Sequence, residues 1–232
     1  MALSSTRDAV SRIFYQRCFW LFGVLVILIG AVTFVPASDH GRLVLNGINV
    51  FVLIATIAAV GRSMLSFVIA LLLAVPAVLF QYVGLWHDSD TDLAWSWIFS
   101  ATLYFMTIVY LVRYVFQPRI MTQDKLFGAA AAYLLIGVFW AYLYAIVGAF
   151  YPRSFMVVGV PGQLVYADAL YLSITVLTST GFGDITPLTR QARGVCMVEQ
   201  ITGALFVAIL IARLAGVYPP RSSYVDDDDV RA

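Results

Sequence analysis

Residues 178–187 read Thr-Ser-Thr-Gly-Phe-Gly-Asp-Ile-Thr-Pro and lie between two long apolar stretches of the chain. Glycines on both sides of an aromatic residue allow backbone φ values that other residues resist. Consecutive carbonyl oxygens can therefore point in one direction. Four copies of such a segment around a common axis would form stacked rings of oxygens, which can replace the water around a dehydrated cation. The chemistry that this segment offers is cation coordination by peptide oxygens.

The composition places this segment in a membrane protein. Of the 232 residues, 62% are hydrophobic and 12% are charged, and the mean hydropathy is +0.90. A soluble protein of this size carries more charge on its surface, and apolar runs long enough to cross a bilayer recur along the chain. The net charge of +1 and the lack of a basic cluster give no indication of a nucleic-acid partner.

Six membrane-spanning helices are predicted from the apolar runs. Each run is long enough for about 30 Å of hydrocarbon at about 1.5 Å per residue. A polar stretch that contains Pro118, which cannot continue a helix with intact hydrogen bonding, separates the first four runs from the last two. The predicted spans are residues 18–36, 43–61, 64–86, 93–117, 126–150 and 192–214.

Two domains follow from these spans. Residues 18–117 are predicted to form a four-helix transmembrane domain, and residues 126–214 a domain with two spans that enclose the glycine-containing segment. Residues 118–125 would link the two domains. Residues 1–17 are predicted as an N-terminal segment, and residues 215–232, which include four consecutive aspartates, as a polar tail.

Basic residues indicate the orientation of the spans. They concentrate before the first span, between the second and third, between the fourth and fifth, and after the sixth, which are all on one side. Cytoplasmic loops carry the excess of arginine and lysine, so both termini are predicted to be cytoplasmic in a multi-pass plasma-membrane protein. The ten residues on this side are Arg7, Arg12, Arg17, Arg62, Arg113, Arg119, Lys125, Arg213, Arg221 and Arg231.

The segment 178–187 resembles the selectivity filter of tetrameric potassium channels, and the number and order of spans resemble a small microbial six-span member of that superfamily. The resemblance implies an all-α membrane protein that assembles as a homotetramer, with six transmembrane helices per chain and a re-entrant pore helix at Asp168–Thr178 in a pore domain at 126–214. It implies K⁺ as the transported ion and no cofactor. Ser179 and Thr180 depart from the commonest family sequence, Thr-Val-Gly-Tyr-Gly, so a non-selective monovalent cation channel is the alternative.

By this resemblance, backbone carbonyls line the ion sites and the Ser179 hydroxyl closes the innermost one. Phe182 lacks the hydroxyl of the family's tyrosine, and Leu172 stands where the pore helix often carries that tyrosine's tryptophan partner. Thr178 and Asp184 are predicted to support the filter, with Asp184 making the external mouth negative. The predicted filter residues are Ser179, Thr180, Gly181, Phe182 and Gly183.

The last span carries three further candidates. Glu199 is the only glutamate of the chain, and a carboxyl group at membrane depth is costly enough to be a functional candidate. The resemblance places it behind the filter; a protonated or hydrogen-bonded packing residue is the equal alternative. Gly203 is predicted as a hinge or, equally, as a close-packing contact. Ala208 and Ala212 are predicted to approach the axis at the cytoplasmic end and to form any hydrophobic gate.

Other function classes have less support. Transporters of related design carry several filter loops in one chain, and this chain has one. No nucleophile–base set, phosphate-cradling loop or metal-ligand cluster indicates an enzyme. His40 and His87 are predicted to be surface residues, and Cys18 and Cys196 to be buried apolar side chains without a disulfide. A non-conducting scaffold and a separate regulatory subunit stay open.

The first four spans lack an array of charges. The fourth span, 93–117, contains a single arginine, Arg113, close to its cytoplasmic end. The resemblance is therefore to a channel without a voltage-sensing arginine array, and no regulatory domain is expected after the sixth span. The polar residues Asn46, Asn49 and Gln81 are predicted to form hydrogen bonds between helices rather than a ligand site.

Weak or absent intrinsic voltage gating is therefore predicted. One charge that crosses the whole membrane field contributes about 2.3 kcal/mol per 100 mV, and Arg113 would cross little of it. The conductance of the purified protein in planar bilayers should change little with voltage. A steep conductance–voltage curve with a gating charge of several units would contradict this prediction.

Overall fold

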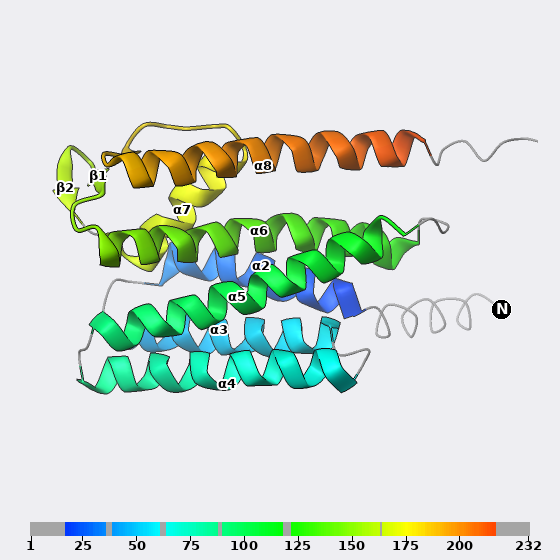
Figure 1. Ribbon diagram of the computed structural model, residues 1–232, viewed down its shortest axis with the longest axis horizontal. Helices are drawn as coiled ribbons and strands as arrows, with labels where there is room; N and C mark the ends of the chain where they lie inside the picture. Colours follow the sequence, from blue (N-terminus) through cyan, green and yellow to red (C-terminus); the bar gives the residue numbers. More distant parts are fainter. Residues whose placement is uncertain are drawn as a thin grey trace, which may run out of the picture.

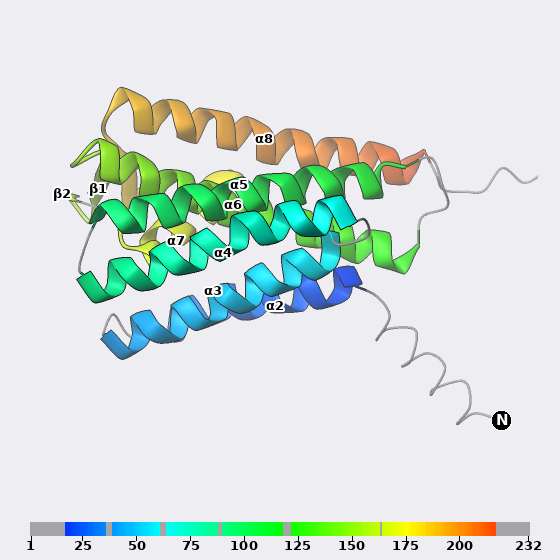
Figure 2. The same ribbon diagram turned by 60° about the horizontal axis from the view of Figure 1, so that its bottom comes forward.

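The computed structural model describes residues 17–35, 39–60, 64–87, 90–117, 122–162 and 164–216. Within these ranges the chain forms six long helices, one short helix and three short strands. Figures 1 and 2 show the long helices packed side by side, with α7 crossing between α6 and α8. The helices are α2 (Arg17–Phe34), α3 (Asp39–Val60), α4 (Met64–His87), α5 (Asp90–Val115), α6 (Gln123–Phe150), α7 (Tyr166–Leu177) and α8 (Arg190–Ala215).

The six long helices coincide with the six predicted spans to within a few residues. By length and composition, four helices of the described residues could cross a membrane. Helices α2 and α3 contain shorter apolar stretches, Cys18–Val32 and Val44–Ala59. The protein therefore has the helices of a multi-pass membrane protein. The four candidate spans are Phe67–Gly84, Leu93–Val115, Gln123–Phe150 and Arg190–Ala215.

Parts of the predicted domain division lie outside the described residues. These are residues 1–16 of the N-terminal segment, residues 118–121 of the linker and residues 217–232 of the tail. The remaining boundaries fall at helix ends, because α5 ends at Val115 and α6 begins at Gln123.

Buried polar side chains join the first helices to one another. Gln81 Nε2 on α4 donates to Asn46 Oδ1 on α3 at 2.6 Å, and Asn49 Nδ2 donates to Gln81 Oε1 at 3.5 Å. On α5, the fully buried Tyr104 donates its hydroxyl to Asn49 Oδ1 at 2.7 Å. Unpaired amides would be costly in an apolar interior, so this network fixes how α3, α4 and α5 face one another. The prediction of interhelical hydrogen bonds is confirmed.

Three tyrosine rings continue this network toward α7. The Tyr104 ring lies 5.5 Å from the ring of Tyr142 on α6, centroid to centroid, and Tyr142 lies 5.4 Å from Tyr166. Such tilted aromatic pairs contribute more than their buried area alone. Because Tyr166 is the first residue of α7, the column connects the four-helix domain to the start of the short helix.

At the opposite end, Asp124 joins α2, α5 and α6. Its Oδ1 accepts the Cys18 backbone N–H at 3.2 Å, and its Oδ2 accepts the Tyr114 hydroxyl at 2.7 Å. Asp124 lies in the first turn of α6, where a carboxylate is favoured by the helix dipole. Arg213 Nη2, near the end of α8, donates to the Gln117 carbonyl at 3.1 Å, so the ends of α5 and α8 also meet.

Three short strands depart from the strictly all-α prediction. They are β1 (Phe155–Val157), β2 (Val160–Gly162) and β3 (Ile185–Pro187), and they form one antiparallel sheet in the order β2-β1-β3. The turn between β1 and β2 has positive φ at Val158 (48°) and Gly159 (81°), the backbone pattern that closes two-residue hairpins. The strands were missed because each has only three residues, too few for a periodic pattern.

We expect Asp124→Ala to lower the free energy of unfolding by about 1–3 kcal/mol, because two donors on other helices lose an acceptor. Thermal or denaturant unfolding of the purified protein in detergent measures this change. Gln123→Ala, an exposed change in the same helical turn, is the matched control and should have little effect. Equal losses in both variants would contradict the role given to Asp124.

Candidate ion-conduction site

The candidate site begins with a helix too short to cross a bilayer. Helix α7 has 12 residues and ends at Leu177, and the capping residue Thr178 donates its backbone N–H to Ile174 O at 3.0 Å. The segment Thr178–Asp184, here called the return loop, then leads to β3 and back to the end of the molecule at which α7 begins (Figure 1). Helix α7 starts two residues before the predicted pore helix, Asp168–Thr178.

The backbone of the return loop alternates in handedness. Ser179, Gly181 and Gly183 have φ values of 57°, 54° and 84°. Glycine adopts this region readily, whereas a residue with a side chain pays about 1–2 kcal/mol. Ser179 is therefore held in this conformation by its surroundings.

Three amide groups of the return loop point back to α7. The N–H of Ser179 donates to Val176 O at 2.9 Å, and the N–H groups of Thr180 and Gly181 donate to Thr175 O at 2.8 and 3.2 Å. In a planar trans peptide the C=O of the preceding residue points the opposite way. The carbonyls of Thr178, Ser179 and Thr180 therefore face away from α7.

The carbonyls of the predicted filter residues are available for a ligand. Within the described ranges, no group donates a hydrogen bond to the carbonyl oxygens of Ser179, Thr180, Gly181 or Phe182. These residues are all exposed. Thr178 supports the loop from its start, because its Oγ1 donates to Ile174 O at 2.7 Å and lies 2.9 Å from Thr180 Oγ1.

At the other end of the loop, Phe182 stacks on a residue that the sequence did not indicate. The rings of Phe182 and Tyr171 are nearly parallel, with an interplanar angle of 9° and centroids 6.2 Å apart. Leu172, the position expected to face residue 182, is buried instead. The sequence does contain an aromatic residue, Tyr171, one position before Leu172. Only the rotation of α7 about its axis decides which of these two side chains faces the loop.

Asp184 links the loop to the β-sheet and to charged neighbours. Its carbonyl accepts the Val158 N–H at 2.9 Å, and its Oδ1 accepts the Ile185 N–H at 3.1 Å. Burial, and then the charge of Asp184, raise the pKa of Asp168. The nearby Asp184 carboxylate also raises the pKa of Tyr171. Two carboxyl groups thus lie near this end of the loop.

Behind the loop, the fully buried Glu199 contacts two helices besides its own. Tyr144 on α6 donates its hydroxyl to Glu199 Oε2, and Ser173 Oγ on α7 lies 2.5 Å from Glu199 Oε1. Ser173 Oγ also lies 2.7 Å from the Gly137 carbonyl on α6. Neither Tyr144 nor Ser173 was predicted from the sequence, since their types are unremarkable in apolar helices.

Gly203 is a close-packing residue in this structure. A Cβ at this position would overlap the Leu177 carbonyl at the end of α7, and α8 runs without a break from Arg190 to Ala215. Below the loop, a hollow of about 370 Å³ lies between α7 and α8. Ala208 lines it, whereas Ala212 does not. Its walls are Tyr133, Leu177, Thr178, Ser179, Gly203, Ala204, Val207, Ala208 and Ile211.

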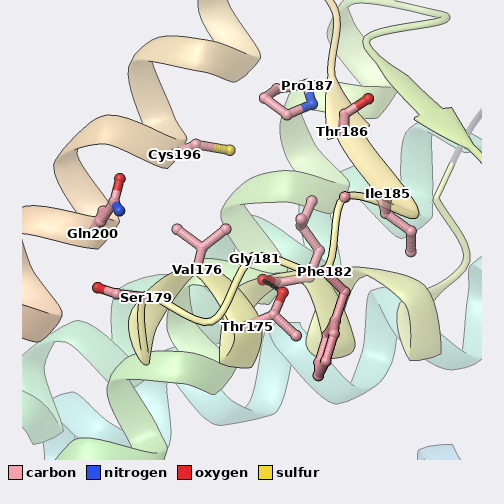
Figure 3. A pocket seen from close by; sticks show the side chains of 12 residues that line it. Thr175, Val176, Ser179, Gly181, Phe182, Ile185, Thr186, Pro187, Cys196 and Gln200 are labelled. Atoms are coloured by element: carbon pink, nitrogen blue, oxygen red, sulfur yellow. Dashed lines mark hydrogen bonds between the residues drawn. The ribbon is translucent and has the colours of Figure 1, made fainter.

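A second hollow, of about 250 Å³, lies between the return loop and the first half of α8. Figure 3 shows Cys196 and Gln200 of α8 on one side of it, with Val176 and Gly181 facing them. Cys18 is buried as predicted, Cys196 is only half-buried, and neither forms a disulfide among the described residues. Among the described residues, no group of three His, Cys, Asp or Glu could hold a metal ion.

One family comparison covers these elements. Residues 126–218 match a protein-family model whose description is "Ion channel". This part of the chain is therefore similar to the domain of ion channels. The match begins in α6 and includes α7, the return loop and α8, close to the predicted domain at 126–214. No curated protein and no solved structure matches the chain.

Gly203→Ala is expected to destabilise the protein by about 1–3 kcal/mol, because the added methyl group meets backbone that cannot rotate away. Gly194→Ala on the same helix is the matched control. No atom lies within 4 Å of a Cβ built there, so it should be neutral or stabilising by up to about 1 kcal/mol. Unfolding in detergent compares the two, and a tolerated Gly203→Ala would favour the hinge interpretation.

Proposed function

We propose that this chain is one subunit of a homotetrameric, potassium-selective channel that conducts K⁺ passively across the plasma membrane. The observation that carries the proposal is the return loop. Its first amides, up to that of Gly181, are bound by α7, and φ is positive at three positions. The carbonyls of Ser179, Thr180, Gly181 and Phe182 have no donor among the described residues. Oxygens arranged in this way suit a monovalent cation that has shed its water.

The need for identical neighbours follows from the bilayer. Non-helical backbone at membrane depth is tolerated only when protein buries it or when it lines a wet cavity. The return loop is exposed in one protomer, and one loop per chain requires identical copies to close a ring. Helix α8 exposes apolar side chains that these copies, or lipid, would cover: Met197, Val198, Ile201, Leu205, Val207, Ile209 and Ile211.

Electrostatics favour a cation at both ends of the loop. The C-terminal end of α7 carries partial negative charge, and this end, at Leu177 and Thr178, borders the hollow of about 370 Å³. Asp184 lies at the external end. In this proposal the Ser179 hydroxyl closes the innermost site, Gly183 completes the filter, and Ala208 and Ala212 approach the axis below it.

The proposal extends the domain to a six-span subunit. Helices α2 and α3 would cross the membrane together with the four longer candidate spans, and both termini would be cytoplasmic. The first four helices would act as a support for the pore rather than as a voltage sensor. No enzymatic activity, cofactor or nucleic-acid partner is proposed.

A non-selective monovalent cation channel is the second candidate. The Phe182 ring is 70% exposed and lacks a hydroxyl that could form a hydrogen bond. The proposed filter therefore has fewer contacts to hold it in place than the commonest family sequence provides. Reversal potentials with K⁺ on one side and Na⁺ on the other distinguish the two candidates. A reversal potential near zero would replace the selective channel by the non-selective one.

Liposomes that contain the purified protein should take up K⁺ along its gradient, and Gly181→Ala should reduce the flux at least about tenfold. Alanine at a left-handed position costs about 1–2 kcal/mol in each subunit, and four copies meet in the ring. Gly159→Ala imposes the same strain in the external hairpin, where φ is 81°, and should conduct. The absence of flux in wild-type liposomes would contradict the proposal.

A further inference from the structure

We propose that Glu199 acts as a neutral carboxylic acid, and that the proton on its carboxyl group holds α7 in position behind the return loop. This inference rests on the proposed function insofar as the return loop conducts ions. It concerns how the loop's supporting helix is held, and Glu199 itself touches no ion in this arrangement.

Two oxygen–oxygen contacts meet at this carboxyl group, and Ser173 makes a third with a backbone carbonyl. Tyr144 Oη contacts Glu199 Oε2, Ser173 Oγ lies 2.5 Å from Glu199 Oε1, and Ser173 Oγ lies 2.7 Å from Gly137 O. All three side chains are fully buried. Each contact is at hydrogen-bond distance and therefore needs one proton between its two oxygens.

Counting protons assigns the state of the carboxyl group. A carboxylate carries no proton, and the hydroxyls of Tyr144 and Ser173 carry one each. Two protons would then serve three contacts, and either Gly137 O or Glu199 Oε1 would face a Ser173 lone pair. A protonated Glu199 supplies the third proton. It donates from Oε1 to Ser173, Ser173 donates to Gly137 O, and Tyr144 donates to Oε2.

The surroundings agree with a neutral group. The polar side chains that act on the Glu199 carboxyl are Ser173 and Tyr144, and within the described ranges no arginine or lysine pairs with it. The other titratable groups near it are Tyr133 on α6 and Cys196 on α8. None of these supplies a positive charge, and an unpaired buried charge is strongly disfavoured.

The proton matters because of where Ser173 lies. Thr175, two residues further along α7, accepts the amides of Thr180 and Gly181 through its carbonyl. Glu199 and Gly203 are four residues apart and share one face of α8. Glu199 holds the middle of α7 through Ser173, and Gly203 contacts the end of α7 at Leu177. Loss of the proton would leave Ser173 with a hydrogen bond to only one of α6 and α8, so the middle of α7 would be held less firmly and the loop amides would shift.

Two substitutions at this position test the inference through conduction. In Glu199→Gln, an amide N–H can donate to Ser173 while the amide oxygen accepts from Tyr144, so K⁺ flux into liposomes should stay within about twofold of wild type. Glu199→Ala leaves buried partners unpaired and should reduce flux at least about tenfold. If Glu199→Gln loses as much flux as Glu199→Ala, a negative charge is required and the inference is overturned.

A spectroscopic measurement tests the proton directly and without ion flux. The infrared spectrum of wild type minus that of Glu199→Gln, recorded at neutral pH on the full-length protein in lipid, should contain the carbonyl stretch of a protonated carboxyl group. Carboxylate bands in its place would overturn the inference. Because this result does not depend on conduction, a wild-type protein without K⁺ flux would refute the proposed function and leave the proton assignment to be judged by its spectrum.

Discussion

A chain that leaves the helical conformation inside a bilayer must find a partner for every backbone amide and carbonyl. In this protein the return loop meets that requirement on one side only. The amides of Ser179, Thr180 and Gly181 are bound by carbonyls of α7, whereas the carbonyls on the opposite side of the same peptide units accept no hydrogen bond from the part of the chain that the structure describes. Under the proposed function, α7 and α8 hold these amides still, and an ion would bind the carbonyls.

Helix α7 is correspondingly held from three directions. Its first residue, Tyr166, packs on the tyrosine column that leads back to α5. Its middle is bound to α6 and α8 through Ser173, and its end contacts Gly203. A short helix gains little stability from its own hydrogen bonds, so these contacts define its position. The rigidity of the loop is therefore a property of its neighbours.

The four-helix domain contributes to this support by packing and hydrogen bonding. Its buried polar groups form neutral pairs, such as Gln81 with Asn46 and Tyr104 with Asn49. Neutral pairs carry no charge that a membrane field could move, and they fix one arrangement of α3, α4 and α5. The ring of Tyr142 connects this hydrogen-bonded group to Tyr166 at the start of α7.

Apolar runs were sufficient to predict the six long helices, and the Gly-Phe-Gly segment was sufficient to indicate the region near 126–214 that matches an ion-channel family model. Span length and backbone freedom are local properties of a sequence. The side-chain partners were not predictable. Tyr171 rather than Leu172 stacks on Phe182, and Glu199 binds Tyr144, 55 residues away. Those pairings depend on the rotation of each helix about its axis, and only packing in three dimensions decides that rotation.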